Sequence, residues 1–273
     1  LPSRLAKYED MYDTEIEGGK SKFRQVDREK SLQSLMTSNL LKRLESSVHS
    51  FRLTLQKLQG KYDGILSIIQ DYNDGLITDK SFSSALANED IDDEDLENIS
   101  ETFIGDNIKI NLADMDVKSW EYDLKNDLKV VEFLLEEMHK ITPEHDFKLQ
   151  DIKSHIDNKI KNPINPGNKK VIVFTAFADT ADYLYEHISE YIQDEHYLHS
   201  AKVTGSKNTT TANGSYDFQS ILTLFSPKSK DKDVLMPDDA NEIDILIGTD
   251  CISEGQNLQD CDYLINYDIH WNP

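Results

Sequence analysis

Apolar residues in the first 160 positions recur every three or four residues, the period of an amphipathic helix. One such stripe begins after Asp27 and should break at Gly60, before a shorter helix. Two further stripes cover residues 117–138 and 149–160, and between them Thr142 can cap a helix that begins at Pro143. The stripes consist of Met36, Leu40, Leu44, Val48, Phe51, Leu55, Leu58, Val117, Trp120, Leu124, Leu128, Val131, Leu135, Met138, Leu149, Ile152, Ile156 and Ile160. This pattern predicts a helical bundle or antiparallel hairpin over residues 1–161.

After the breaker-rich segment 162–167, NPINPG, the pattern changes to alternating short strands and helices. Strands are predicted at 171–174, 201–203, 243–247 and 263–267, and helices at 183–192 and 218–225. Asp179 or Thr180 can cap the first of these helices. Residues 206–215 are expected to form a loop, and 227–241 a polar excursion. Short connections of this kind predict a parallel sheet flanked by helices, so residues 168–273 form an α/β domain after the helical half.

Each predicted strand ends in polar or small residues. The ends are Thr175, Thr204-Gly205, Thr249-Asp250 and Asp268. Because the carboxyl ends of parallel strands share one edge of a sheet, these residues should lie together at the edge where ligands bind in open α/β folds.

Charge is unevenly distributed along the chain. Acids outnumber bases by 51 to 29, for a formal charge of −22, which argues against a nucleic-acid-binding surface over the whole molecule. Residues 89–97 alone hold seven acids in nine positions, so about 76–115 is interpreted as a solvated acidic insertion. Residues 1–75 are near neutral, and Lys42, Arg43 and Arg52 in the first long helix could meet phosphates. The favoured interpretation is that these three cations face solvent.

Neither the two cysteines nor the hydropathy of the chain indicates a metal site, a disulfide framework or a membrane span. Cys251 and Cys261 fit neither a zinc site nor a disulfide framework, so both are expected to be thiols in a reducing compartment. No run approaches the roughly 18 apolar residues of a membrane span. The chain begins Leu-Pro-Ser and stops after Trp-Asn-Pro, so it is expected to be a piece of a longer cytoplasmic protein.

An ordered set of short motifs occupies residues 243–273. The motifs are Thr249-Asp250, Ser253-Glu254-Gly255, Asn257-Leu258-Gln259, Asn266-Tyr267-Asp268 and Trp271-Asn272-Pro273. At this spacing the set resembles motif V and its extension in superfamily-two helicases and translocases, most closely the Swi/Snf-like and RapA-like branch. Residues 171–184, VIVFTAFADTADYL, resemble motif IV of the same family, and residues 40–51, LLKRLESSVHSF, look like a string that precedes the second motor domain in some RapA-like translocases.

The resemblance implies the second RecA-like lobe of an ATP-driven motor that translocates on nucleic acid, with double-stranded DNA as the expected partner. Matched residue by residue, it implies nucleic-acid contacts at Thr249, Thr175 and Gly205. Gly255, Asn257 and Glu254 match positions near the bound nucleotide. Asp250 and Asp268 are expected to support the loops or to couple the two ligand sites.

Several parts of such a motor are not found in this sequence. It has no G-x-x-x-x-G-K-[ST] loop and no acidic magnesium motif ahead of the sheet, so ATP and magnesium would be held mainly by a first RecA-like lobe. The family's arginine motif would begin just past Pro273. No catalytic residue and no metal ligand is therefore expected in this chain. The fragment alone should not hydrolyse ATP, and its sheet should lack its last elements.

Two other interpretations stay open. The first is a non-enzymatic scaffold, in which a helicase-like lobe is joined to an acidic helical region that binds a protein partner. The second is an unrelated nucleotide-binding α/β enzyme, although its glycine-rich fingerprint is not found. The motor interpretation, with a cytoplasmic and nucleoid-associated location, is favoured because the motifs occur in order.

Overall fold

The structure is a computed structural model that describes residues 14–15, 22–76, 114–205, 207–252 and 256–269. The chain divides into two compact units. One contains residues 1–41 and 53–137, and the other contains residues 42–52 and 138–273. The helical half followed by a helix-flanked, mainly parallel sheet confirms the predicted fold class.

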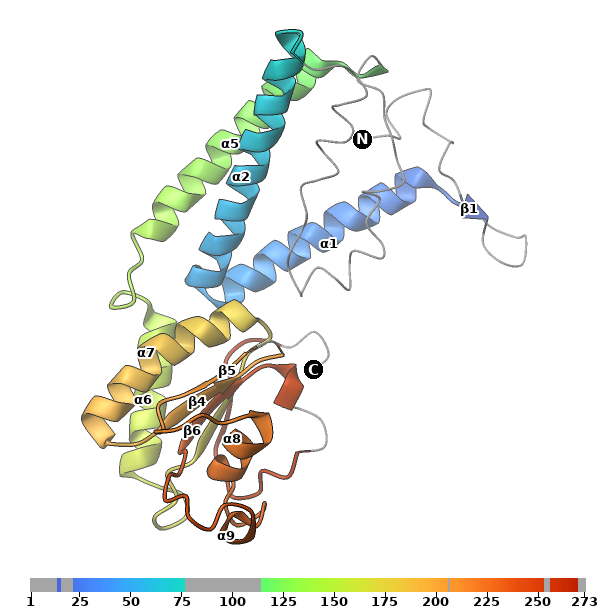
Figure 1. Cartoon of the computed structure of the whole chain (residues 1–273). Helices are drawn as coiled ribbons and strands as arrows, with labels where there is room; N and C mark the ends of the chain where they lie inside the picture. Colours follow the sequence, from blue (N-terminus) through green and yellow to red (C-terminus); the bar gives the residue numbers. More distant parts are fainter. Residues whose placement is uncertain (1–13, 16–21, 77–113, 206, 253–255, 270–273) are drawn as a thin grey trace. The chain divides into compact units, whose positions relative to one another are not determined.

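In the first unit, two long helices form an antiparallel hairpin. Helix α2 (Val48–Asn73) lies beside helix α5 (Val117–His139), as Figure 1 shows. Ile69 near the end of α2 packs with Leu124 near the start of α5, which fixes the antiparallel direction. Helix α1 (Gln25–Ser46) precedes this hairpin. Two short antiparallel strands, β1 (Thr14–Glu15) and β2 (Lys22–Phe23), precede α1.

The first long apolar stripe is not one helix broken at Gly60, as the sequence pattern predicts. The break falls at Ser47, between α1 and α2, and α2 runs through Gly60. The Ser47 hydroxyl accepts the amide of Ser50 at 3.0 Å, which is the bond of a helix cap. A glycine inside a helix costs only about 1 kcal/mol relative to alanine, so packing along a long helix outweighs it.

The second unit is built on a five-stranded sheet of order β5-β4-β6-β3-β7. The strands are β3 (Val171–Phe174), β4 (Ser200–Val203), β5 (Asn208–Thr210), β6 (Ile245–Gly248) and β7 (Leu264–Asn266). All neighbouring pairs are parallel except β4 and β5. The predicted 206–215 loop therefore contains an edge strand, which its Asn-Thr-Thr sequence conceals because it has no apolar residue to mark it.

Helices cover both faces of this sheet (Figure 1). Helix α6 (Phe147–Lys161) and helix α7 (Ala178–His196) pack on the face that carries Val171, Val173, Ile245 and Ile247. Helix α8 (Phe218–Phe225) packs on the opposite face, against Ile172, Ala201, Val203 and Leu246. Successive residues of β3 and β6 point to opposite faces of the sheet, and helices bury both faces. These strands are therefore continuous apolar runs.

Helix starts differ from the sequence predictions in two places. Thr142 and Pro143 lie in a turn, and Asp146 caps α6 by accepting the amide of Leu149 at 3.1 Å. Neither Asp179 nor Thr180 caps α7, because the helix begins one residue before Asp179 and its cap position is Phe177. The polar excursion after α8 contains the short helix α9 (Lys232–Leu235).

Helix α6 precedes the breaker segment at 162–167, yet it belongs to the compact unit of the sheet. Its buried residues Leu149, Ile152 and Ile156 complete one core cluster with β3 and α7. None of the helices in the described ranges is long and apolar enough to cross a membrane.

Ile156→Ala is expected to lower the free energy of unfolding of the sheet unit by about 2–5 kcal/mol, because it leaves a cavity under α6. Denaturant unfolding, with hydrogen exchange read at residues 171–174, measures this effect. Ile164→Ala is the matched control, because Ile164 is 63% exposed; its cost should stay within about 0.5 kcal/mol. Equal costs for the two variants would show that α6 is not part of this core.

Candidate functional site at the carboxyl edge of the sheet

The strand register brings the predicted strand-end residues to one edge. Phe174 is paired with Gly248 on one side and with Asn266 on the other, and Val203 is also paired with Gly248. The backbone hydrogen bonds between neighbouring strands continue for one more residue at these strand ends. The amides of Thr175, Thr249 and Tyr267 donate to the carbonyls of Gly248, Val203 and Phe174 at 3.1, 3.3 and 2.8 Å. The predicted residues at 175, 205, 249 and 268 therefore end neighbouring strands.

Thr249 starts a tight turn that follows β6. It is half-buried, and the 3-10 turn Asp250–Ile252 closes on it, since the Ile252 amide donates to the Thr249 carbonyl at 3.1 Å. Gly248, just before it, has no room for a side chain. A Cβ there would overlap Cδ1 of the buried Ile252 and would lie 3.3 Å from the Val203 carbonyl oxygen. The glycine thus lets Ile252 pack against the strand end and sets the position of Thr249.

Gly205 lies in the tight turn between β4 and β5. The Thr204 hydroxyl donates to the Lys207 carbonyl at 3.0 Å and accepts the Lys207 amide at 3.1 Å, so the turn is held from within. Gly205 is exposed, and a Cβ there would meet no heavy atom within 4 Å. The fold itself therefore does not require glycine at this position.

Of the three residues predicted near the nucleotide, the structure describes one. Glu254 and Gly255 lie outside the described residues. Asn257 is exposed, and its side-chain amide donates to the Ser229 carbonyl at 3.3 Å. Asp260 accepts the amides of Lys228 and Ser229 at 2.7 and 3.0 Å, which ties the loop after β6 to the segment after α8.

Thr175 and Asp268 are buried rather than open to solvent. Thr175 is 1% exposed, and its hydroxyl donates to Asp268 at 2.6 Å. Asp268 is 7% exposed and also accepts the Ala176 amide at 2.8 Å and the Ser46 hydroxyl at 2.6 Å. This carboxylate joins the ends of β3 and β7 to a segment more than two hundred residues earlier in the chain.

That early segment, residues 42–52, is called the corner here; it holds the last turn of α1, Ser47 and the first turn of α2. Arg43 is 3% exposed, pairs with Asp179 and lies 4.9 Å from the centre of the Phe177 ring, so its predicted solvent-facing position is wrong. Asp179 and Thr180, expected as helix caps, instead bind the corner through Ser50 and Ser46. The Ser46-Ser47 pair inside an apolar stripe was the one sequence signal for this contact.

An aromatic contact holds the other side of the corner. His49 stacks on Tyr183, with ring centroids 5.0 Å apart, and the Tyr183 hydroxyl donates to Asp146 at 3.0 Å. Burial, with a further contribution from Arg52, lowers the pKa of His49, so its ring is neutral at pH 7. Burial and the nearby Asp146 raise the pKa of Tyr183. The phenol therefore stays protonated and keeps its role as a donor.

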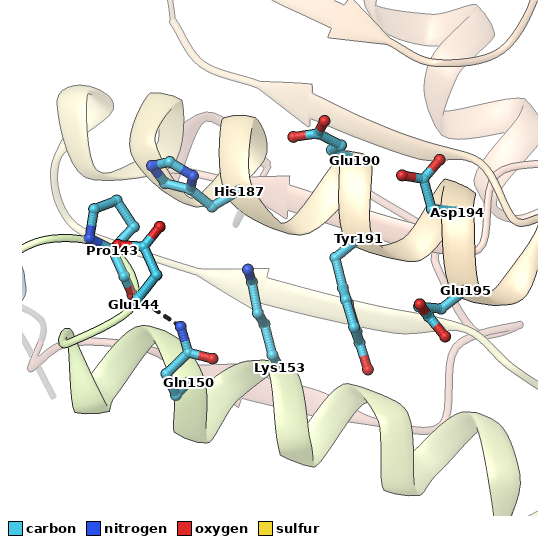
Figure 2. Close-up of a pocket in the computed structure, with 9 residues that line it drawn as sticks. All are labelled: Pro143, Glu144, Gln150, Lys153, His187, Glu190, Tyr191, Asp194 and Glu195. Atoms are coloured by element: carbon cyan, nitrogen blue, oxygen red, sulfur yellow. Dashed lines mark hydrogen bonds between the residues drawn. The ribbon is translucent and has the colours of Figure 1, made fainter.

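A pocket of about 290 Å³ between α6 and α7 is a separate feature of this unit (Figure 2). Glu144, Glu190, Asp194 and Glu195 line it, together with one cation, Lys153. Burial lowers the pKa of Lys153, against the opposing effect of Glu144 and Glu190. Four carboxylates around one amine repel phosphate groups, so this pocket is unsuited to a nucleotide or to a nucleic-acid backbone.

Among the residues that the structure describes, no group of three or more His, Cys, Asp or Glu could hold a metal ion.

Gly248→Ala is expected to destabilise the sheet unit by about 1–3 kcal/mol, because the new methyl group overlaps Ile252. Ile252→Val removes Cδ1 and should cost about 0.5–1.5 kcal/mol alone. The double variant should then be more stable than the sum of the two single changes predicts, which denaturant unfolding of all four proteins measures. Strict additivity would show that the packing of Ile252 does not explain the glycine.

The family model of the helicase conserved C-terminal domain matches residues 151–273, from within α6 to the end of the chain. No curated protein matches the chain. The matched range includes all five strands of the sheet and every predicted site residue at its carboxyl edge. The match supports a helicase C-terminal lobe over residues 151–273.

Proposed function

We propose that this chain supplies the second motor lobe of an ATP-dependent translocase of the Swi/Snf-like or RapA-like branch. The observation that carries the proposal is the convergence of Thr249 and Gly205 at one sheet edge, within the range that matches the helicase model. In this proposal ATP hydrolysis drives movement on double-stranded DNA, in the cytoplasm and in association with the nucleoid.

Nucleic acid would lie along the carboxyl edge. The Thr249 hydroxyl is a suitable donor to a phosphate oxygen, and the exposed Gly205 lets a backbone approach closely. Lys207, exposed two residues later, adds a positive charge beside that glycine. The Thr175 hydroxyl is bonded to Asp268, so Thr175 would contribute by shaping the edge, while Asp250 and Asp268 would support the loops.

The nucleotide would be shared with a first RecA-like lobe, which holds the ATP phosphates and magnesium. Asn257 fits a part in this arrangement, because its side chain is exposed and its amide nitrogen is already bonded to Ser229. The amide oxygen of Asn257 can then accept a ribose hydroxyl. Gly255 and Glu254 are proposed beside it from the motif alone. When bound, ATP supplies the phosphoryl group that is transferred to water.

A protein-binding scaffold is the second candidate, and one observation favours it. Helix α5 exposes Tyr122, Val130 and Phe133, which are 68%, 58% and 59% exposed. Large apolar side chains gathered on one helix are typical of contact surfaces for protein partners. In this alternative residues 1–161, with the acidic insertion at about 76–115, would bind a protein partner and the lobe would not work as a motor.

ATPase activity of the intact protein, measured with and without duplex DNA at low and stated salt, separates the two candidates. Strong stimulation by duplex supports the motor, since phosphate contacts weaken as salt rises. A folded intact protein that hydrolyses no ATP under either condition would favour the scaffold.

Thr249→Val is expected to raise the duplex concentration for half-maximal ATPase stimulation by about tenfold or more. The reason is that a hydrogen bond to a charged group contributes about 1.5–3 kcal/mol, and 1.4 kcal/mol is tenfold. Thr209→Val is the matched control, because Thr209 is the middle residue of β5 and is paired with Lys202 inside the sheet. Equal behaviour of the two variants would overturn the Thr249 contact.

Gly205→Ala tests whether a nucleic-acid backbone approaches this turn closely, and it does so without disturbing the fold. The added methyl group meets open space, so the free energy of unfolding should change by less than about 1 kcal/mol. Duplex affinity, measured by fluorescence anisotropy on the intact protein, should fall several-fold if a backbone phosphate passes over this turn. Unchanged affinity would remove Gly205 from the proposed track.

A further inference from the structure

The buried Asp268 carboxylate draws its hydrogen bonds from three different segments. Ser46 ends α1, Thr175 follows β3, and Ala176 opens the connection to α7. Each donates to Asp268 at 2.6 to 2.8 Å. No lysine or arginine of the described residues forms an ion pair with Asp268, so these three donors replace the water that burial removes. Loss of any one donor weakens the stabilisation of a buried charge.

The direction of the hydroxyl bonds in the corner follows from these contacts. Asp268 accepts all three of them, and each hydroxyl has one proton. Since Ser46 donates to Asp268, Thr180 must donate in its 2.8 Å contact with Ser46. Ser47 must then donate in its 3.0 Å contact with Thr180. The hydroxyl protons therefore point in one sequence, from Ser47 through Thr180 and Ser46 to Asp268.

Other contacts fix the corner at both helix ends. Lys148, in the first turn of α6, donates to the carbonyls of Glu45 and Ser46 at 2.6 and 3.0 Å and so satisfies the end of α1. Ser50, in the first turn of α2, donates to Asp179 at 2.6 Å. Glu45 accepts the amide of Ile269 at 3.4 Å, but among the described contacts of the corner only the Ser46 bond reaches Asp268 itself.

We propose that Asp268 is a positioning residue that couples the corner to the carboxyl edge of the sheet. Through Ser46 it holds the junction of α1 and α2, and through Thr175 and Ala176 it holds the end of β3. A displacement of the junction changes the hydrogen bonds available to Asp268 and thereby the edge at which Thr249 and Gly205 lie. This role in transmitting motion rests on the proposed motor function; the coupling itself does not.

The Ala176 amide is a direct reporter of this coupling, because it donates to one oxygen of Asp268 and Ser46 donates to the other. Residue-resolved hydrogen exchange on the full chain, without ATP or nucleic acid, would follow it. Ser46→Ala should accelerate exchange at Ala176 by about tenfold, since a lost hydrogen bond to a charged group of about 1.5 kcal/mol corresponds to that factor. Ser46→Cys keeps a similar size with a weak donor, so it should shift exchange in the same direction if Ser46→Ala does not fold.

Ser50→Ala is the matched control, because it makes the same change in the same corner but removes a bond to Asp179. Exchange at Ala176 should stay within about twofold of the parent chain in this variant. Equal acceleration by Ser46→Ala and Ser50→Ala would mean that any loosening of the corner has this effect and would overturn the role of Asp268. No acceleration in Ser46→Ala would overturn it as well.

A second measurement, on the intact protein, tests whether motion of the corner is transmitted to the carboxyl edge. Ser46→Ala should leave basal ATP hydrolysis unchanged and reduce its stimulation by duplex several-fold, whereas Ser50→Ala should keep the stimulation. Full stimulation in Ser46→Ala would confine Asp268 to a structural role. If the unsubstituted protein hydrolyses no ATP at all, the proposed function fails, and hydrogen exchange still decides the coupling.

Discussion

A carboxylate that folding removes from water must find donors inside the protein, and at Asp268 this requirement joins the ends of β3 and β7 to the corner. The donors come from the end of β3, from the connection to α7 and from the α1–α2 junction. Because the carboxylate lies one residue beyond the Phe174–Tyr267 bond, it continues the strand register into the loops. Its contacts hold Thr175 and the start of the connection to α7, and they add to the ion pair of Arg43 and the bond of Ser50 that also fix the corner.

The edge combines a rigid frame with open positions. Gly248 and Ile252 lock the end of β6, and Thr204 and Lys207 lock the turn after β4. Between these fixed points, Gly205 is exposed and Thr249 is half-buried. A site built this way can hold a polymer backbone with few contacts. Its loops are already ordered by contacts within the protein, so little conformational entropy is lost on binding.

The pocket between α6 and α7 collects four carboxylates on the outer side of one helix layer (Figure 2). Lys202 and Lys170, in contrast, are buried beside carboxylates of Asp182 and Glu242 and serve the packing of β4 and β3. A strongly negative formal charge is therefore compatible with a local phosphate contact at the carboxyl edge.

The sequence by itself determined the elements whose periodicity is strong: helices α5, α6 and α8, and strands β3, β4, β6 and β7 all lie where the apolar pattern predicts them. It also placed Thr175, Gly205, Thr249 and Asp268 at one edge, because parallel strands end on the same side. Only the tertiary structure decided that the first stripe breaks at Ser47, that Arg43 is buried and that Asp179 and Thr180 bind the corner. These outcomes depend on partners more than a hundred residues away, and periodicity carries information only about neighbours within a few turns.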